Sequence, residues 1–553
     1  MFQRRAIIPT PRRAALAGLF ALPLLAAAPA PDPVSPQRLS DDVKVLASDA
    51  FGGRAPGTPG EAKTIAWLVE QFKAAGLQPG GPGGSWTQPV PLIRTQLGSG
   101  TIAANGAAWT QGREVYLSTV RPVDRATIAK APLVFVGYGV SAPEQGWDDF
   151  KGVDLKGKVA VFLVNDPDFE AKPGEDAAGR FGDRRMTYYG RWTYKFEEAG
   201  RRGAIGALIV HDTPGAGYGW ATVTAPGGEN YDVAQPRNPR VLLQGWIKGA
   251  AATKLFAAAG QDLAALRAAA RRRDFRPVAL KGDGFSADLP VSVVRAESRN
   301  VLAKVPGRSR PDEVVMYGAH WDAYGEGAPD AQGRRIRPGA NDDALGTAGV
   351  LAIARAAAAR RDFARTQVFA LWTGEERGLL GSETYAADPV YPAAKTVANL
   401  TLDILQTAGP ARDVMLVGAG QNALEDRLAT AAKAQGRVVM PEALPERGLF
   451  YRADHFSLAR RGVPTLLLMA ISGAPDLVNG GRAAGQAWLD GYMRCYHQTC
   501  DAWSADWKLE GAAADVDLIR RIGFDLANGR DWPEWRAGSE FRAVRDQTAG
   551  ERR

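Results

Sequence analysis

The sequence lacks several features that would place it in other functional classes. After residue 30 no apolar run approaches the ~20 residues of a membrane-spanning helix. No block of lysine and arginine is interleaved with aromatic residues, so nucleic acid is not an expected partner. Neither a phosphate-binding glycine loop nor the serine elbow of a Ser-His-Asp hydrolase is present in its required context. With 45% hydrophobic and 23% charged residues, the composition is that of a globular protein.

The first thirty residues form the only distinctly apolar segment. Four arginines precede an apolar stretch from Ala14 to Leu25, and the small-residue site Ala28-Pro29-Ala30 follows. This layout predicts a secretory signal peptide over 1–30, with a retained anchor as the alternative. Its removal lowers the formal charge from +8 to +4. We therefore expect an exported protein, periplasmic or secreted, with no stable membrane insertion after signal removal.

Cysteine is also scarce, since Cys495 and Cys500 are the only two in the chain. In an oxidising compartment the expectation is a disulfide, and the alternative is a zinc site formed by both thiolates and His497. A loop this short contributes only about 2 kcal/mol of stability. Its main expected effect is to hold the loop that carries His497, so that metal affinity becomes sensitive to reductant.

The remaining pattern predicts an α/β fold interrupted by an insertion. A helix is expected between Thr58 and Gly76, with Glu61 completing a capping box with Thr58. Short β-rich runs between 121 and 285 indicate an inserted β-rich module. From Val291 onward, apolar strands alternate with helices, which predicts a mostly parallel sheet with helices on both faces. The expected divisions are an N-terminal part of the α/β domain at 31–120, its main part at 286–530, and a C-terminal tail at 531–553.

Acidic and imidazole side chains follow the strands of this sheet. Ligands of such sheets bind beyond the carboxyl ends of the strands, so these side chains are expected to converge there. The residues concerned are His320, Asp322, Asp342, Asp343, Glu375, Glu376, Asp403 and His497. Without a cation, carboxylates brought so close would repel one another.

This inventory fits a pair of metal ions. Imidazole with carboxylate suits zinc, and manganese or cobalt is also possible. The number of ligands exceeds the need of one ion and matches two ions bridged by one carboxylate. Side chains that follow a strand point in different directions, so Glu375 and Glu376 are expected to differ in role. One would bind metal and the other would hold a proton from the reacting water.

Two further histidines and the glutamate pair also have simpler explanations. Taken alone, Glu375 and Glu376 could form a charged turn, and only the accompanying histidines and aspartates overturn that interpretation. His455 is expected to be structural, paired with Asp454, because the ligand set is complete without it. His211 is expected to be structural or exposed.

Five motifs in order, "GAHWD", "GANDDALG", "WTGEERGLLGS", "TLD" and "CYHQTCD", resemble the co-catalytic zinc aminopeptidase family, metallopeptidase family M28. The resemblance covers about Val291 to Asn528, and "LASDAFGGRAPGTPG" is also similar. The insertion resembles a protease-associated domain. The chain departs from the family pattern at Leu345 and Thr401, where the family often has Ser and Asn.

The resemblance implies a role for each site residue. Asp342 would bridge two zinc ions, with its peptide bond to Asp343 often cis in the family. The other implied metal ligands form two pairs, namely Glu376 with His497 and His320 with Asp403. Glu375 would be the general base and Asp322 would orient His320. Two tyrosines, Tyr451 and Tyr496, are candidates for an oxyanion or substrate contact.

The expected function is an exported exopeptidase acting on peptides, most simply an aminopeptidase. A carboxypeptidase or a glutaminyl-cyclase-like enzyme on the same fold is the alternative, because such relatives share ligands. A non-catalytic receptor-like relative is disfavoured because the implied ligands and the base are all present. The insertion is a candidate lid or a restriction on peptide length.

Overall fold

The computed structural model describes residues 1–3, 34–224 and 226–552. Apart from residues 1–3, the expected signal peptide lies outside this range. Residues 33–553 form one compact unit. Among the described residues, no helix combines the length and the apolar character needed to cross a bilayer.

The larger sheet is mixed, with a parallel centre. Across the sheet the order is β11 (Glu229–Val233), β2 (Thr87–Leu97), β13 (Val278–Val305), β17 (Arg365–Trp372), β14 (Arg310–His320), β18 (Thr396–Leu402), β21 (Thr465–Leu468), β19 (Asp413–Leu416) and β20 (Val438–Pro441). Of these, the neighbouring strands β17, β14, β18 and β21 run parallel, and antiparallel strands flank them. The short β1 (Gln78–Pro79) also pairs with β13. The prediction of a mostly parallel sheet is confirmed for its centre.

Both faces of the central strands are buried, as the continuous apolar runs predict. In β14, Val315 and Tyr317 belong to a core shared with one set of helices, whereas Val314 and Met316 pack on the opposite face. Side chains of a strand alternate between faces, so two separate helix layers are needed. The first layer contains α1 (Pro36–Leu46), α2 (Pro59–Ala74), α8 (Leu345–Arg360), α10 (Leu424–Ala434) and α13 (Glu510–Asn528). The second contains α9 (Leu380–Ala387) and α11 (His455–Ala459).

A second sheet with its own cores lies between Leu97 and Val293. Its strands are β3 (Thr101–Ala104), β4 (Ala107–Ala108), β5 (Val115–Ser118), β6 (Arg125–Phe135), β9 (Val159–Leu163), β10 (Gly206–His211) and β12 (Leu243–Lys248). Its helices are α3 (Trp192–Arg201), α4 (Thr213–Ala216), α5 (Trp220–Thr224), α6 (Gly249–Ala258) and α7 (Leu263–Ala269). These strands begin before residue 121, where the insertion was expected to start.

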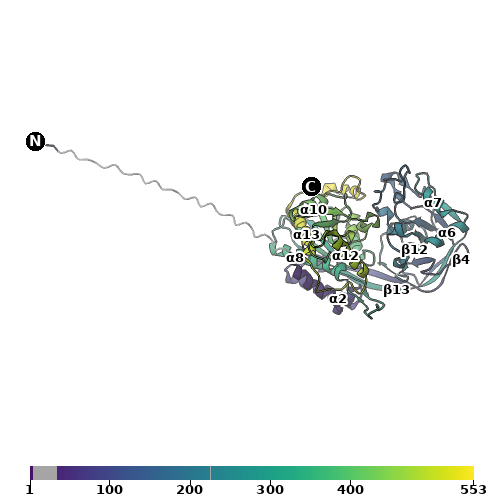
Figure 1. Cartoon of the computed structure of the whole chain (residues 1–553), viewed down its shortest axis with the longest axis horizontal. Helices are drawn as coiled ribbons and strands as arrows, with labels where there is room; N and C mark the ends of the chain where they lie inside the picture. The colour runs from purple at the N-terminus through teal and green to yellow at the C-terminus, as the bar shows by residue number, and fades with distance from the viewer. Residues whose placement is uncertain (4–33, 225, 553) are drawn as a thin grey trace. The chain divides into compact units, whose positions relative to one another are not determined.

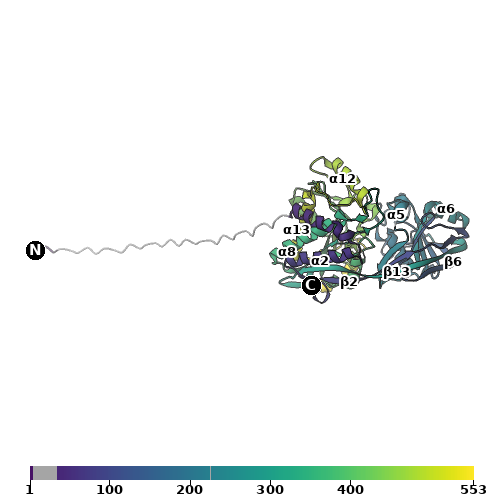
Figure 2. The same ribbon diagram turned by 90° about the horizontal axis from the view of Figure 1, so that it is seen from below.

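The long strand β13 belongs to both sheets. Residues 278–290 pair with β6, and residues 291–301 pair with β2. Figure 1 shows β13 extending between the region of α2, α8 and α13 and the region of α6 and β12. Figure 2 shows β13 meeting β2 and β6 from a second side. The remaining elements are the ribbons β7 (Ser141–Ala142) with β8 (Trp147–Asp148) and β15 (Gly325–Glu326) with β16 (Ile336–Arg337), and helices α12 (Gly481–Cys495) and α14 (Arg542–Asp546).

The helix expected after Thr58 is present, but its cap differs from the prediction. Helix α2 begins at Pro59 and ends at Ala74, and Gly76, which has a φ of 77°, follows it. The Thr58 hydroxyl donates to the carbonyl of Ala55 at 2.7 Å instead of capping the helix. Glu61 accepts from the N–H of Gly57, and from the hydroxyl of a buried serine in β13 at 2.8 Å. The capping-box prediction is therefore wrong because tertiary contacts offer Glu61 other donors.

The disulfide prediction is confirmed. Cys495 and Cys500 are joined with a Cα–Cα distance of 5.0 Å. Both sulfurs are used in this bond, so the alternative of a zinc site built on two thiolates is excluded. The bridge closes the turn that carries His497 directly after α12.

Candidate metal centre

Acidic and imidazole side chains lie at the carboxyl ends of three parallel strands, at one edge of the larger sheet. His320 is the last residue of β14, and Asp403 follows the last residue of β18 directly. Glu375 and Glu376 follow β17 after a two-residue turn. Because β14 lies between β17 and β18, the carboxyl ends of the three strands meet at the same edge. The strand pattern therefore explains why these four residues lie together.

Two further residues reach this edge from outside the strands. Asp342 lies in the turn Ala340–Ala344 just before α8, and its peptide bond to Asp343 is cis. His497 lies in the disulfide-closed turn after α12, with a φ of 63°. Neither position follows from the strand pattern, since both depend on how loops fold back onto the sheet.

The carboxylate of Asp342 lies between the two imidazoles. Its Oδ1 is 3.1 Å from Nε2 of His320, and its Oδ2 is 3.1 Å from Nε2 of His497. The two sides each carry a further carboxylate. Nε2 of His320 is 3.9 Å from Oδ1 of Asp403, and Nε2 of His497 is 3.2 Å from Oε2 of Glu376. The arrangement has one bridging carboxylate and one imidazole–carboxylate pair on each side.

These separations fit metal coordination. Two ligand atoms on one tetrahedral zinc, each bonded at about 2.0 to 2.1 Å, are about 3.3 Å apart. Buried oxygens at the site also lack hydrogen-bond donors, namely Oδ1 of Asp403 and Oε1 of Glu376. A buried carboxylate oxygen without a donor is costly, and a cation removes that cost. The donor set therefore fits a divalent ion such as zinc.

The electrostatics of the chain alone lead to the same conclusion. Burial, together with the charge of Asp342, raises the pKa of Asp403 to about 7. Burial and neighbouring carboxylates raise the pKa of Glu375 and of Glu376 well above the usual range. Ionising all of these groups in one buried site is unfavourable without a compensating positive charge.

Asp343 is close enough to be considered as a ligand, but its oxygens already accept hydrogen bonds. It groups with His320 and Asp403 by distance. Its Oδ2 accepts from the N–H of His320 at 3.2 Å, and its Oδ1 accepts from the N–H of Gly346 at 2.9 Å. The oxygens of Asp342 face the two imidazoles instead, which makes Asp342 the better bridging candidate.

Asp322 contacts His320 through its main chain more closely than through its carboxylate. Nδ1 of His320 is 3.0 Å from the carbonyl oxygen of Asp322 and 3.6 Å from its Oδ1. The same Oδ1 accepts from the N–H of Glu375 at 3.1 Å. Asp322 therefore contacts both the histidine and the segment that carries the two glutamates.

Sequence reasoning did not assign a role to Asp501. Its carboxylate accepts from the N–H of Asn341 at 3.0 Å and from the N–H of Asp342 at 3.1 Å. Asp501 adjoins Cys500, so the disulfide-closed turn holds both His497 and the main chain of Asp342. The motif "CYHQTCD" already contained this aspartate, but only the structure shows which loop it contacts.

Replacement of Asp501 should weaken metal binding although Asp501 touches no metal. We expect D501A to lower zinc affinity by about 10- to 100-fold, because the main chain that carries Asp342 loses its two acceptors. The more conservative D501N, which keeps one acceptor, should lose less. Competition with a chromophoric chelator measures this affinity, and D506A, at an exposed position of the same segment, is the control. Unchanged zinc affinity in D501A would contradict the assignment.

Arg54 is a second residue that the sequence did not single out. It is fully buried and donates to four main-chain carbonyl oxygens. Two of them belong to Trp321, at 2.7 Å, and Gly339, at 2.8 Å. These residues lie beside the segments of His320 and Asp342. Arg54 therefore joins the N-terminal part of the chain to both sides of the site.

The two candidate tyrosines differ in their surroundings. The hydroxyl of Tyr451 donates to Oε1 of Glu540 at 2.6 Å. The ring of Tyr496 lies against His497, with centroids 3.6 Å apart, and that of Tyr324 is 4.5 Å from the same imidazole. Tyr496 and Tyr324 therefore lie beside the site, whereas the proton of the Tyr451 hydroxyl is already donated.

The remaining histidines are structural. His455 is fully buried, packs edge-on against Phe450 at 4.7 Å, and burial lowers its pKa to about 3. His211 is 6% exposed, and its Nε2 lies 3.0 Å from the carbonyl oxygen of Tyr218. The hydrogen-bonded pair expected between His455 and Asp454 is not among the hydrogen bonds of the described residues.

Comparison with known proteins agrees with this geometry. Residues 300–518 match the model of peptidase family M28. Aminopeptidase Y of Saccharomyces cerevisiae is 28% identical over 224 residues, which cover 39% of this chain and 36% of that protein. The probable lipoprotein aminopeptidase LpqL of Mycobacterium tuberculosis is 24% identical over 435 residues, covering 76% of this chain and 70% of that protein.

A solved aminopeptidase from Aneurinibacillus sp. strain AM-1 aligns with a TM-score of 0.49 and 19% identity, covering 92% of this chain and 95% of that chain. The present chain spans only about a third of the length of aminopeptidase Y. All of the candidate metal ligands lie inside the matched region. The region from residue 300 to residue 518 thus matches the peptidase domain of family M28.

Proposed function

We propose that this chain is a zinc-dependent aminopeptidase that holds two metal ions around Asp342. The observation that carries the proposal is the placement of both Asp342 carboxylate oxygens against imidazole nitrogens, each at 3.1 Å. A carboxylate shared in this way is the arrangement of two-metal hydrolases. The aminopeptidase names of aminopeptidase Y and LpqL support the reaction class.

The proposed ligands form two groups that share Asp342. His320 and Asp403 complete one group, and His497 and Glu376 complete the other. Zinc fits these donors best, and manganese or cobalt would use the same ligands. Glu375 then remains as a carboxylate that no ligand pair requires.

Glu375 is proposed as the general base. Its Oε2 lies 3.9 Å from Nε2 of His320, and its N–H is held by Asp322 at 3.1 Å. Zinc, when bound, polarises the scissile carbonyl and lowers the pKa of the reacting water. Glu375 takes the proton of that water and passes it to the leaving amine. Tyr496 is the preferred candidate for contacting the developing oxyanion, because Tyr451 donates its proton to Glu540.

Two alternatives share the same ligands. A carboxypeptidase or a glutaminyl-cyclase-like enzyme would differ in the substrate pocket and not in the metal centre. A non-catalytic receptor-like relative would have no need of a free carboxylate such as Glu375 beside the ligands.

A substrate panel separates these functions. The aminopeptidase proposal expects zinc-dependent release of p-nitroaniline from leucyl- and alanyl-p-nitroanilide, and no cleavage of N-acetylated dipeptides. Turnover of N-acetylated dipeptides alone would indicate a carboxypeptidase. Pyroglutamate formation from N-terminal glutaminyl peptides would indicate a cyclase, and no reaction on any of the three would favour the receptor-like alternative.

Export is proposed from the N-terminal sequence and from the lipoprotein name of the relative LpqL. The expected mature protein begins near residue 31 and lies outside the cytoplasm. N-terminal sequencing of the protein from fractionated cells tests this. A cytoplasmic protein that retains Met1 would rule it out.

A further inference from the structure

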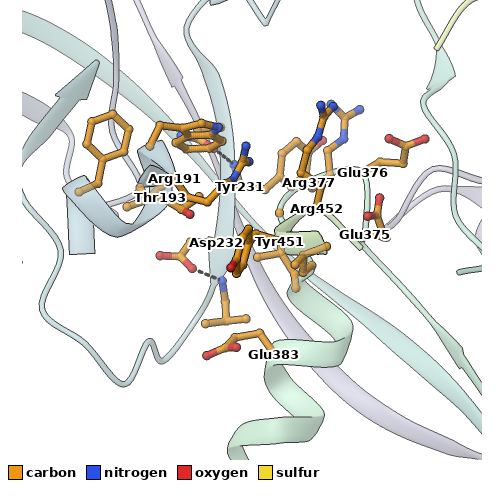
Figure 3. A pocket seen from close by; sticks show the side chains of 18 of the residues that line it. Arg191, Thr193, Tyr231, Asp232, Glu375, Glu376, Arg377, Glu383, Tyr451 and Arg452 are labelled. Carbon is orange, nitrogen blue, oxygen red and sulfur yellow. Dashed lines mark hydrogen bonds between the residues drawn. The ribbon is translucent and has the colours of Figure 1, made fainter. Parts of the chain in front are cut away.

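A cavity of about 810 Å³ adjoins the candidate metal centre, and both sheets contribute to its wall. Glu375 lies at one side of it, while residues of the second sheet region, such as Arg191, line it as well. Figure 3 shows Arg191, Arg377 and Arg452 among the residues of this wall, together with Glu375 and Glu376. A peptide bound at the metal centre would extend into this cavity.

Two arginines of the cavity that are buried or half-buried have no acidic partner. Arg191 precedes α3 in the second sheet region, and Arg452 follows the turn Leu449–Tyr451 in the peptidase domain. Arg191 is only 6% exposed, and its Nε has no hydrogen-bond partner. Among the described residues, no carboxylate oxygen lies within 4.0 Å of a guanidinium nitrogen of either arginine.

Three other arginines of the cavity have acidic partners. The pairs are Arg240 with Asp232 at 2.7 Å, Arg460 with Glu197 at 3.3 Å, and Arg377 with Glu229 at 3.8 Å. Arg237 has no acidic partner either, but it is exposed to solvent. Among the described residues, Arg191 and Arg452 are therefore the buried or half-buried arginines of the cavity without an acidic partner.

Both guanidinium groups line the same cavity, so their like charges oppose each other there. Burial, and after it the charge of Arg452, lowers the pKa of Arg191 to about 10.

Two desolvated cations without a counterion are unfavourable, and a bound anion relieves both. Buried charges in proteins are normally paired, because the loss of solvation is otherwise uncompensated. Guanidinium groups match carboxylates in geometry and form short, charge-assisted hydrogen bonds with them. Peptides, the substrates of the proposed function, carry carboxylates at their C-terminus and on acidic side chains.

We propose that Arg191 and Arg452 together bind a carboxylate of the peptide substrate close to the scissile bond. This inference rests on the proposed peptidase function and adds a substrate class to it. The carboxylate has two possible sources, which are the C-terminus of a dipeptide and an acidic side chain next to the cleaved bond. In both cases one arginine comes from the peptidase domain and the other from the second sheet region.

Matched substrate pairs test the proposal by the ratio of their kcat/KM values. The pairs are leucyl-glycine against leucyl-glycinamide, leucyl-glutamic acid amide against leucyl-glutamine amide, and glutamyl- against glutaminyl-p-nitroanilide. We expect the charged member of at least one pair to be favoured about 10- to 100-fold. The first pair reports a C-terminal carboxylate, and the other two report an acidic side chain on either side of the bond.

Substitution of each arginine should remove this preference. In R191Q and R452Q the ratio is expected to fall toward one, whereas R237Q, which removes an exposed charge at the rim of the same cavity, should retain it. The ratio is taken within each variant, so a general loss of activity cancels. Zinc content and thermal unfolding check that the variants are folded.

Binding measurements make the test independent of turnover. In an E375Q background, calorimetry of leucyl-glycine and leucyl-glycinamide, or of the second pair, should give the same preference in the zinc-loaded protein, and added R452Q should remove it. Ratios near one in the parent protein, in turnover and in binding, would overturn the inference while leaving leucyl-p-nitroanilide hydrolysis as evidence for the aminopeptidase. A preserved preference in R191Q and R452Q would overturn it as well.

Discussion

The variant E375Q is expected to retain its zinc and lose nearly all turnover. Glutamine has the volume of glutamate but cannot take a proton, so kcat should fall by about 10²- to 10⁴-fold while KM changes little. Glu375 is suited to proton transfer because burial and its acidic neighbours raise its pKa well above the usual range. It lies beside His320 without completing either ligand pair, so the metal content should not change.

The measurement combines steady-state kinetics with metal analysis of the purified protein. E326Q is the matched control, since Glu326 is exposed in β15 and lies outside the ligand set. Loss of zinc from E375Q would move Glu375 into the ligand set. Turnover close to that of the parent protein would mean that another group takes the proton.

Removal of the Asp342 carboxylate, the proposed bridge, is expected to have the second largest effect, and this effect is on the number of bound zinc ions. The parent protein should bind about two zinc ions per chain. The variants H320A and H497A should each retain about one, because each loses a ligand of one side only. D342A should retain neither, since both imidazoles lose the oxygen that lies 3.1 Å from them. Activity should follow the number of bound ions.

Zinc per chain is measured by mass spectrometry after gel filtration in buffered zinc, with D506A as a control for a lost surface charge. A parent protein with a single ion would contradict the two-ion proposal. Two ions in D342A would show that a different residue bridges them, and Asp343 would then be the first residue to test.

The ends of the parallel strands were the most predictable part of the site. His320 is the last residue of an apolar strand, whereas Asp403 and Glu375 come one and three residues after such strands. Parallel strands present their carboxyl ends at one edge of the sheet. Local pattern and one rule of topology are enough to bring such residues together. The disulfide was equally predictable, because only two cysteines exist and five positions separate them.

Contacts between distant segments were not predictable in this way. The carboxylate of Asp501 accepts a hydrogen bond from the N–H of Asp342. Arg54 donates hydrogen bonds to the carbonyl oxygens of Trp321 and Gly339, which are far from it in the sequence. Glu61 accepts a hydrogen bond from a serine hydroxyl of β13 and does not form the expected capping box. Each of these polar groups could have bonded locally, and only the packing of loops against the sheet selected a distant partner.

The amino-acid sequence alone determined the types of ligand and the strand ends that carry most of them, because hydrophobic periodicity and strand direction are local properties. The tertiary structure decided which aspartate faces both imidazoles, which residues hold that aspartate in place, and which arginines line the cavity without a carboxylate close to their guanidinium groups. Such choices depend on distances between segments far apart in the chain, where the burial of charge makes one pairing favourable and another costly.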